Sequence, residues 1–236
     1  MCIRDRYKIM KTILGVFCFS FSIIFCQSAN FSYKEIAEQN IQGHAEKIAT
    51  TSSLWLSDHI NILRLNKYKL YLKYSQSVFF KEINGLNWVL PSFQFGLKPT
   101  DNLMISGKFF GVHLDEESPQ IIGGGLHYIA GEDQDWVISF QKSALNGVND
   151  FRVVSTLFHI DKRLQKSFYD FFIGFGINYY ISNSYFYSIE LPKKIEGDLN
   201  RLALAIIIPY KTINVCASSQ ISSKNQLFQL ALVKGF

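Results

Sequence analysis

Residues 168–181 read FYDFFIGFGINYYI, and this stretch decides the fold class. Large apolar side chains occupy every odd position, whereas several even positions are small or polar. A period of two predicts a strand with one apolar face. Strands of globular proteins usually have about five or six residues, whereas a strand that crosses a bilayer needs roughly 9–11. The odd positions are Tyr169, Phe171, Ile173, Phe175, Ile177, Tyr179 and Ile181, and the even ones include Asp170, Gly174, Gly176 and Asn178.

The composition of the whole chain agrees with this strand. Hydrophobic residues make up 48%, aromatic residues 15% and charged residues 18% of the chain, whereas soluble domains average about 25% charged residues. The net charge of +5 is concentrated in residues 1–29, and no basic run or zinc-knuckle spacing follows. Nucleic acid is therefore not an expected partner. Three of the four cysteines also lie in residues 1–29, so Cys216 alone remains and no internal disulfide is expected.

The N-terminus predicts export. Residues 10–29, MKTILGVFCFSFSIIFCQSA, begin with a lysine after Met10 and continue with a short apolar run that ends in small residues. This run is too short for a transmembrane helix but is typical of a signal peptide, with cleavage expected after Ala29. We interpret residues 1–9 as a spurious extension. Residues 30–53 are polar and are expected to form an N-terminal segment or plug, whereas residues 54–236 are expected to form the barrel.

Segments of alternating hydrophobicity, separated by turn signals, fill the remaining chain. About eleven candidate strands can be counted, and bacterial single-chain barrels have even strand numbers. We therefore predict a closed antiparallel transmembrane β-barrel of about 12 strands, or 10 if a candidate is false. Besides 168–181, the strand that precedes the turn at 161–166 and the C-terminal strand, the clearer candidates are 67–78, 89–97, 136–141 and 201–208, the weaker ones are 54–65, 103–114, 120–130 and 212–222, and a hidden strand is sought at 184–191. Turn signals lie at 98–102, 115–119, 131–135, 146–150, 161–166, 191–198 and 222–224.

The C-terminal stretch, residues 226–236, reads QLFQLALVKGF and ends on an aromatic residue. Phe228, Leu230, Leu232 and Phe236 share one face, which Lys234 interrupts near the strand end, where its amine can reach water. This pattern is similar to the recognition signal of bacterial outer-membrane barrels. The resemblance implies insertion into outer-membrane lipid by the barrel-assembly machinery of a Gram-negative bacterium.

A second resemblance concerns residues 37–75, AEQNIQGHAEKIATTSSLWLSDHINILRLNKYKLYLKYS. They resemble the N-terminal stretch of PorV/PorQ proteins, which belong with the FadL-like barrels. Gly43, Ala45 and Ala49 match a small-residue segment, and Ser57-Asp58-His59 stand where that family has Asn-Pro-Ala. The resemblance implies a role in type IX secretion, with secretion-system proteins as partners, or in the passage of hydrophobic compounds.

Basic residues on the polar faces suggest two interpretations of the lumen. Lys67, Lys69, Lys73 and Arg201 would make an anion-preferring lumen, because lumen side chains tune selectivity. Alternatively, the lumen is packed and these charges pair internally. The sequence leaves both interpretations open.

No catalytic signature stands out, and we expect neither enzyme activity, cofactor nor metal. With the turn at 161–166, His159 would lie about opposite Asp170 and Ser155 opposite Gly174. A histidine oriented by a carboxylate is half of a hydrolase constellation, so an outer-membrane lipid hydrolase is one alternative function. His113 and His127 show no metal-ligand spacing with His159.

The favoured hypothesis is a non-catalytic barrel in transport, secretion or envelope structure. The remaining alternative is a soluble exported β-sandwich that binds a ligand.

Overall fold

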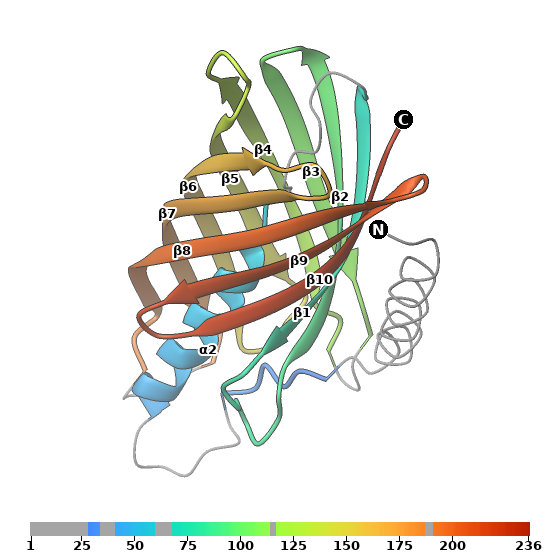
Figure 1. The fold of residues 1–236 in the computed structure, drawn as a ribbon. Helices are drawn as coiled ribbons and strands as arrows, with labels where there is room; N and C mark the ends of the chain where they lie inside the picture. The colour runs from blue at the N-terminus through green and yellow to red at the C-terminus, as the bar shows by residue number, and fades with distance from the viewer. Residues whose placement is uncertain (1–27, 34–40, 60–67, 114–116, 187–190) are drawn as a thin grey trace.

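The computed structural model describes residues 28–33, 41–59, 68–113, 117–186 and 191–236. Within them the chain forms a closed antiparallel barrel, in which each strand pairs with the next and β10 pairs with β1 (Figure 1). No helix in these ranges is long and apolar enough to cross a membrane. The elements are α2 (Ile41–Leu56), β1 (Leu70–Phe79), β2 (Val89–Thr100), β3 (Leu103–Gly111), β4 (Gln120–Ala130), β5 (Trp136–Asn146), β6 (Phe151–Gln165), β7 (Asp170–Ser184), β8 (Lys194–Tyr210), β9 (Ile213–Ser222) and β10 (Gln226–Gly235).

The predicted strand faces are confirmed. On β7, Ile173, Phe175 and Ile177 are exposed on the outside of the barrel, whereas Asp170 and Asn178 are buried inside it. The same alternation runs along β4, β5 and β6. Apolar side chains facing outward from a closed ring exclude the β-sandwich, in which these faces would pack against each other.

The number of strands in the described residues is ten, so the expectation of about 12 was wrong and the alternative of ten is confirmed. Two candidates account for the difference. Residues 54–56, expected in a strand, form the last turn of α2, and residues 60–67 lie outside the described ranges. Of the hidden candidate at 184–191, Ser184 ends β7, Tyr185, Phe186 and Leu191 are not in a strand, and residues 187–190 lie outside the described ranges.

The terminal strand closes the barrel, as expected. Leu232 lies opposite Tyr74 of β1, and the Phe236 N–H donates to the Leu70 carbonyl over 2.9 Å. The Phe236 side chain is exposed, and the Lys234 amine lies 4.7 Å from its ring centroid. The last residue thus completes the backbone ladder while its side chain remains on the outer surface.

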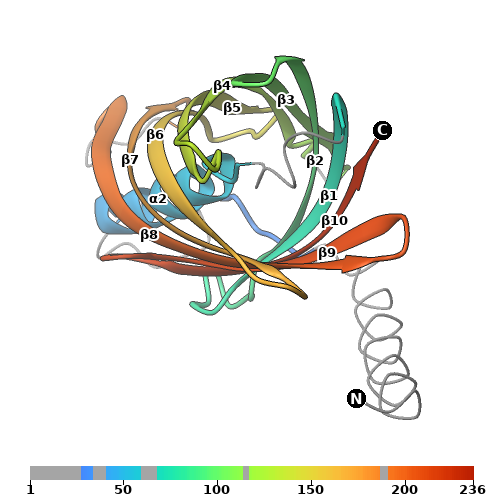
Figure 2. The ribbon, with the colours of Figure 1, turned by 45° about the horizontal axis from the view of Figure 1, so that its top comes forward.

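Helix α2 lies across the inside of the ring (Figure 2). Thr50 to Leu56 are all buried, and the helix contacts β5, β6, β7 and β8. The hydroxyl-rich run in this half is a poor helix former in isolation, but the barrel supplies partners for it. Asn225 donates to the Thr51 hydroxyl over 2.9 Å, and the hydroxyls of Thr50 and Tyr180 are 3.1 Å apart. The helix is therefore a plug within the barrel.

The interior has three layers along the strands. Beside α2, one apolar cluster includes Trp55 and Phe151. A second apolar cluster, which includes Met104 and Phe172, fills the other end. Along β1, β7 and β10 the residues between the two clusters are polar or small, and we call this middle zone the polar layer. Its buried wall residues include Lys73, Gln94, Lys108, Gln141, His159, Asp161, Asn178, Arg201 and Gln229.

Candidate functional site

The C-terminal end of α2 is held in the polar layer by donors from the barrel wall. The last carbonyls of a helix have no partner inside the helix. Here Asn178 of β7 donates to the Ser53 carbonyl over 3.1 Å, and Lys108 of β3 donates to the Leu56 carbonyl over 2.9 Å. Gln141 of β5 also reaches the Leu56 carbonyl, over 3.1 Å. The wall thus replaces the capping residues of an ordinary helix end, and a cation beside the helix C-terminus is favourable.

The residues that follow α2 are bound in the same way. Arg201 of β8 donates through Nη1 to the Ser57 carbonyl over 2.7 Å, and Gln141 reaches the Asp58 carbonyl over 3.0 Å. Lys73 of β1 donates to the His59 carbonyl over 2.9 Å. Because these donors come from strands around the ring, Ser57-Asp58-His59 lie deep inside the barrel. We call α2 and this tripeptide together the plug.

Asp58 of the plug carries a buried negative charge that is compensated by a lysine of the barrel wall. Its carboxylate is 2.9 Å from the Lys73 ammonium, and Gln94 also donates to it. The Lys108 ammonium donates to the backbone carbonyl of the same residue. Asp58 and Lys73 are each only 1% exposed. Removing one partner from such a pair leaves an uncompensated buried charge, which is strongly unfavourable.

A second buried cluster joins the plug to β6. Asp161 accepts from His59 Nε2 over 3.0 Å through one carboxylate oxygen and from His159 Nε2 over 2.9 Å through the other. Arg201 Nη2 donates to His59 Nδ1 over 2.8 Å. A guanidinium can only donate, so His59 Nδ1 is the acceptor and its Nε2 carries the proton toward Asp161.

Two glycines of β7 make room for this cluster. A Cβ at Gly174 would overlap the Asp161 carboxylate and His159 Nε2, and a Cβ at Gly176 would overlap His159 Nδ1. Neither glycine has a positive φ. Gly174 and Gly176 are therefore needed because the His159 and Asp161 side chains lie against the β7 backbone, and not because the backbone has an unusual conformation.

The expected pairing of His159 with Asp170 was wrong. Strand β6 continues through residues 161–165, so the turn comes later and His159 lies opposite Gly176. Asp170 is instead 3.5 Å from Arg163. Ser155 lies opposite Tyr180 and donates to Asn178 Oδ1 over 2.6 Å. The structure does not bring His159, Asp170 and Ser155 together, so it gives no support to a lipid hydrolase.

The other two histidines considered from the sequence, His127 and His113, bond to serines and not to this cluster. His127 is fully buried, and its ring nitrogens are each 2.8 Å from a serine hydroxyl, one on Ser106 and the other on Ser139. His113 is exposed beyond β3, with Nδ1 2.9 Å from the Ser118 hydroxyl. Sequence reasoning missed His59 and Asp161, because one was assigned to a strand and the other to a turn.

The expected lumen cations divide into three groups. Lys73 and Arg201 are fully buried in the polar layer and bind the plug. Lys69 is exposed just before β1, and Lys67 lies outside the described residues. Lys108, on the weaker candidate strand 103–114, was not among the expected lumen cations, but it is buried and also contacts the plug. The interpretation of a packed lumen with paired charges describes Lys73, which pairs with Asp58. Arg201 is also packed inside the lumen, but it donates to Ser57, Gln220 and His59 and not to a carboxylate.

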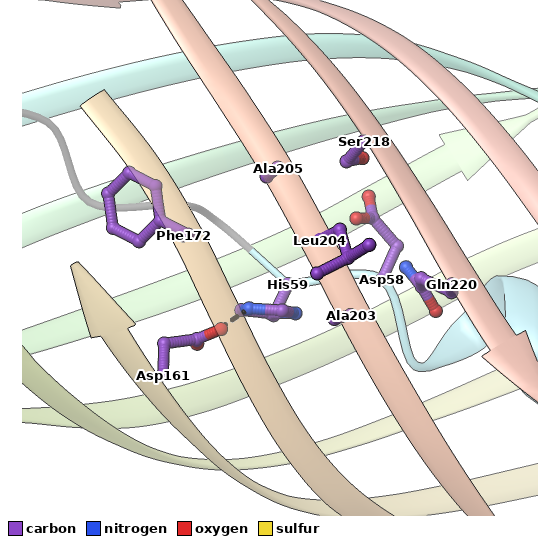
Figure 3. A pocket seen from close by; sticks show the side chains of 9 residues that line it. All are labelled: Asp58, His59, Asp161, Phe172, Ala203, Leu204, Ala205, Ser218 and Gln220. Atoms are coloured by element: carbon purple, nitrogen blue, oxygen red, sulfur yellow. Dashed lines mark hydrogen bonds and ion pairs between the residues drawn. The ribbon is translucent and has the colours of Figure 1, made fainter. Parts of the chain in front are cut away.

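A small cavity of about 10 Å³ adjoins the cluster, which is room for about one water molecule (Figure 3). The side chains of Asp58, His59 and Asp161 lie on its polar side, and Phe172 borders it from β7. The alanines of β8, Ala203 and Ala205, line it with Leu204, Ser218 and Gln220.

Together these features define the class of protein. A closed antiparallel barrel with an apolar outer surface and a polar interior is a transmembrane β-barrel of the outer-membrane type. Within the described residues, the lumen is occupied by the chain's own N-terminal plug.

Comparisons with known proteins find likeness in structure but not in sequence. No family model and no curated protein matches the sequence. Similar solved structures include the N-terminal β-barrel domain of Pseudomonas aeruginosa OprF, with 7% identity, a TM-score of 0.37, and coverage of 71% of this chain and 96% of that chain. The translocator domain of autotransporter NalP from Neisseria meningitidis has 10% identity and a TM-score of 0.38, and the match covers 82% of this chain and 97% of that chain. KdgM porin in complex with disordered oligogalacturonate has 7% identity and a TM-score of 0.40, and the match covers 70% of this chain and 99% of that chain. Likenesses this distant carry no function over to this chain.

Proposed function

We propose that this protein is a non-catalytic barrel of the bacterial outer membrane that acts in transport and whose resting state is closed by its own plug. The observation that supports this most directly is the set of wall donors on the carbonyls of Ser53, Leu56, Ser57 and Asp58. These contacts are polar and can exchange with water. When the plug is displaced, water can therefore satisfy the donors and acceptors that it leaves behind.

The solute that this lumen would pass is anionic. With the plug displaced, Lys73, Lys108 and Arg201 lose the carbonyls and the Asp58 carboxylate that they now contact. Among the described residues, Asp161 is the acidic residue that stays beside them on the wall, since Asp170 is engaged by Arg163. Three cations against one carboxylate would attract anions to the constriction.

Single-channel recording of the purified protein in planar bilayers tests this function. The informative variant is Asp58→Ala, which removes the charge that Lys73 contacts but leaves the wall intact. The control is Asp135→Ala, because Asp135 pairs with Lys162 outside the lumen. We expect wild type and Asp135→Ala to be closed for most of the recording. We expect Asp58→Ala to open, with a reversal potential in a KCl gradient that favours chloride.

Two results would contradict the proposal. One is a steadily open wild-type channel, because the plug would then not close the lumen. The other is the absence of channel current from every variant, including the double variant that combines Asp58→Ala with Arg201→Gln. That result would indicate a scaffold and not a transporter.

A role in secretion or in the passage of hydrophobic compounds is the second candidate, and it is supported by the resemblance of residues 37–75 to PorV/PorQ proteins. The described part of this segment includes the plug and most of β1. If the protein serves secretion, chemical cross-linking in cells should capture secretion-system components, and Asp58→Ala should not conduct. Capture of barrel-assembly proteins alone would argue for the transport proposal instead.

A further inference from the structure

The cluster of His59, Asp161 and His159 has the donor set of a transition-metal site. Each residue offers one ligand atom, and these atoms all lie within 4.8 Å of one another. All three side chains are buried. His159 and Asp161 stand two residues apart on one face of β6, and the plug supplies the third ligand. Two imidazoles and one carboxylate suit Zn²⁺ and other first-row divalent ions.

We propose that His59, His159 and Asp161 bind a divalent transition-metal ion, with Zn²⁺ as the representative case. Ligand atoms around a tetrahedral zinc lie about 3.3 Å apart. Asp161 already holds His59 Nε2 at 3.0 Å and His159 Nε2 at 2.9 Å, each through a different carboxylate oxygen, so whichever oxygen binds the ion is near that spacing from one of the two histidines. The widest pair needs to close by at most about 1.5 Å, which is within the reach of side-chain rotation.

Two further features favour a bound ion. His159 Nδ1 is buried and makes no hydrogen bond in the described structure, so the ring can change tautomer without losing a contact there. The adjoining cavity, which His59 and Asp161 line, has room for about one water molecule. That water would take the fourth position of a three-ligand zinc site.

Arg201 opposes the ion in a way that can be measured. Coordination through His59 Nε2 places the imidazole proton on Nδ1, where Arg201 Nη2 now donates. Zn²⁺ uptake therefore breaks this hydrogen bond, while Arg201 retains Ser57 and Gln220 through Nη1. Arg201, Lys73 and Lys108 also repel the incoming cation, so the site is weaker than a structural zinc site.

The position of the ion links metal to gating. His59 belongs to the plug, whereas His159 and Asp161 belong to the wall, so the ion would join the two. Bound metal would stabilise the closed state, because it binds only when plug and wall are together. This consequence rests on the proposed function, whereas the site itself does not.

The test is zinc binding by the full chain, refolded in detergent without metal. Isothermal titration and the zinc retained after dialysis are measured for wild type, His159→Ala, Asp161→Asn and the control His113→Ala. We expect one equivalent in wild type and His113→Ala, and loss of binding in His159→Ala and Asp161→Asn. Arg201→Gln removes a competing donor and a positive charge, and should tighten binding on the order of tenfold, the scale on which partners of metal-bound histidines act.

Wild-type protein that takes up no Zn²⁺ overturns the site, whatever the folding of the variants. Equal uptake by folded Asp161→Asn overturns it as well. The effect of the ion on gating is measured separately by single-channel recording, in which added Zn²⁺ should close the Asp58→Ala channels. Channels that open in Asp58→Ala without zinc uptake by wild type would reject the metal site alone. Zinc uptake with no conductance in any variant would reject the transport function alone.

Discussion

At the scale of single residues, the buried pair of Lys73 and Asp58 gives the sharpest stability prediction. Lys73→Met leaves the Asp58 carboxylate without its ammonium partner and should lower the free energy of unfolding by about 3–5 kcal/mol. Urea unfolding in lipid vesicles measures this. Lys162→Met is the matched control, because its ion pair with Asp135 is partly exposed and should contribute less than about 1 kcal/mol. Equal losses in both variants would show that the lumen pair is not specially important.

Gly176 gives a second prediction at this scale. An added methyl group would overlap His159 Nδ1 and come within 2.7 Å of the Phe158 carbonyl oxygen. Gly176→Ala should therefore destabilise the barrel by about 1–3 kcal/mol, the usual effect of overpacking. The control is Gly111→Ala, where the nearest atom is 3.6 Å away on a flexible glutamine. If both variants unfold at the same urea concentration, the close approach at His159 is not tight.

Among the elements, β10 allows folding and assembly to be separated. The Phe236 backbone pairs with β1, but its side chain is exposed on the outside. Phe236→Ser should therefore refold in detergent with nearly wild-type stability, while insertion into the outer membrane of cells falls strongly, because the recognition signal has lost its terminal aromatic. Phe158→Ser, which changes an equally outward side chain of β6, should refold and insert normally. Normal insertion of Phe236→Ser would contradict the role assigned to the terminal residue.

How far the sequence predicts each element depends on whether local pattern or tertiary contact decides it. The faces of β7 and β10 follow from alternation alone, since burial inside a closed ring requires the same period. The end of β6 does not, because Asp161, Lys162 and Arg163 read as a polar turn. In the structure they alternate: Asp161 and Arg163 face the lumen, and Lys162 lies outside beside Asp135. This misplaced turn produced the false pairing of His159.

The candidate site was less predictable than the strands. Residues 54–56 are apolar and resemble a strand, yet they end a helix whose last carbonyls are bound by residues far away in the sequence. Only closure of the barrel brings Lys73, Lys108 and Arg201 to that helix end. A buried cation can be predicted from a strand face, but its partner on the plug cannot. The sequence therefore left the choice between an anion-preferring and a packed lumen open.

For the whole molecule, the apolar outer surface makes its own prediction about the bilayer. The chain has three tryptophans. Trp55 and Trp88 are fully buried, whereas Trp136 is exposed at the start of β5, with the Lys162 ammonium 4.6 Å from its ring centroid. An exposed tryptophan beside a cation at a strand end is typical of the membrane interface.

In vesicles of brominated lipid, bromine near the headgroup should quench the fluorescence of Trp136 more than bromine deep in the acyl chains. The variant Trp136→Phe should be nearly insensitive to both, because Trp55 and Trp88 are shielded by the barrel. Strong quenching of Trp136→Phe would mean that lipid reaches the residues that now surround the plug, and the closed barrel would then be the wrong description of the protein in a membrane.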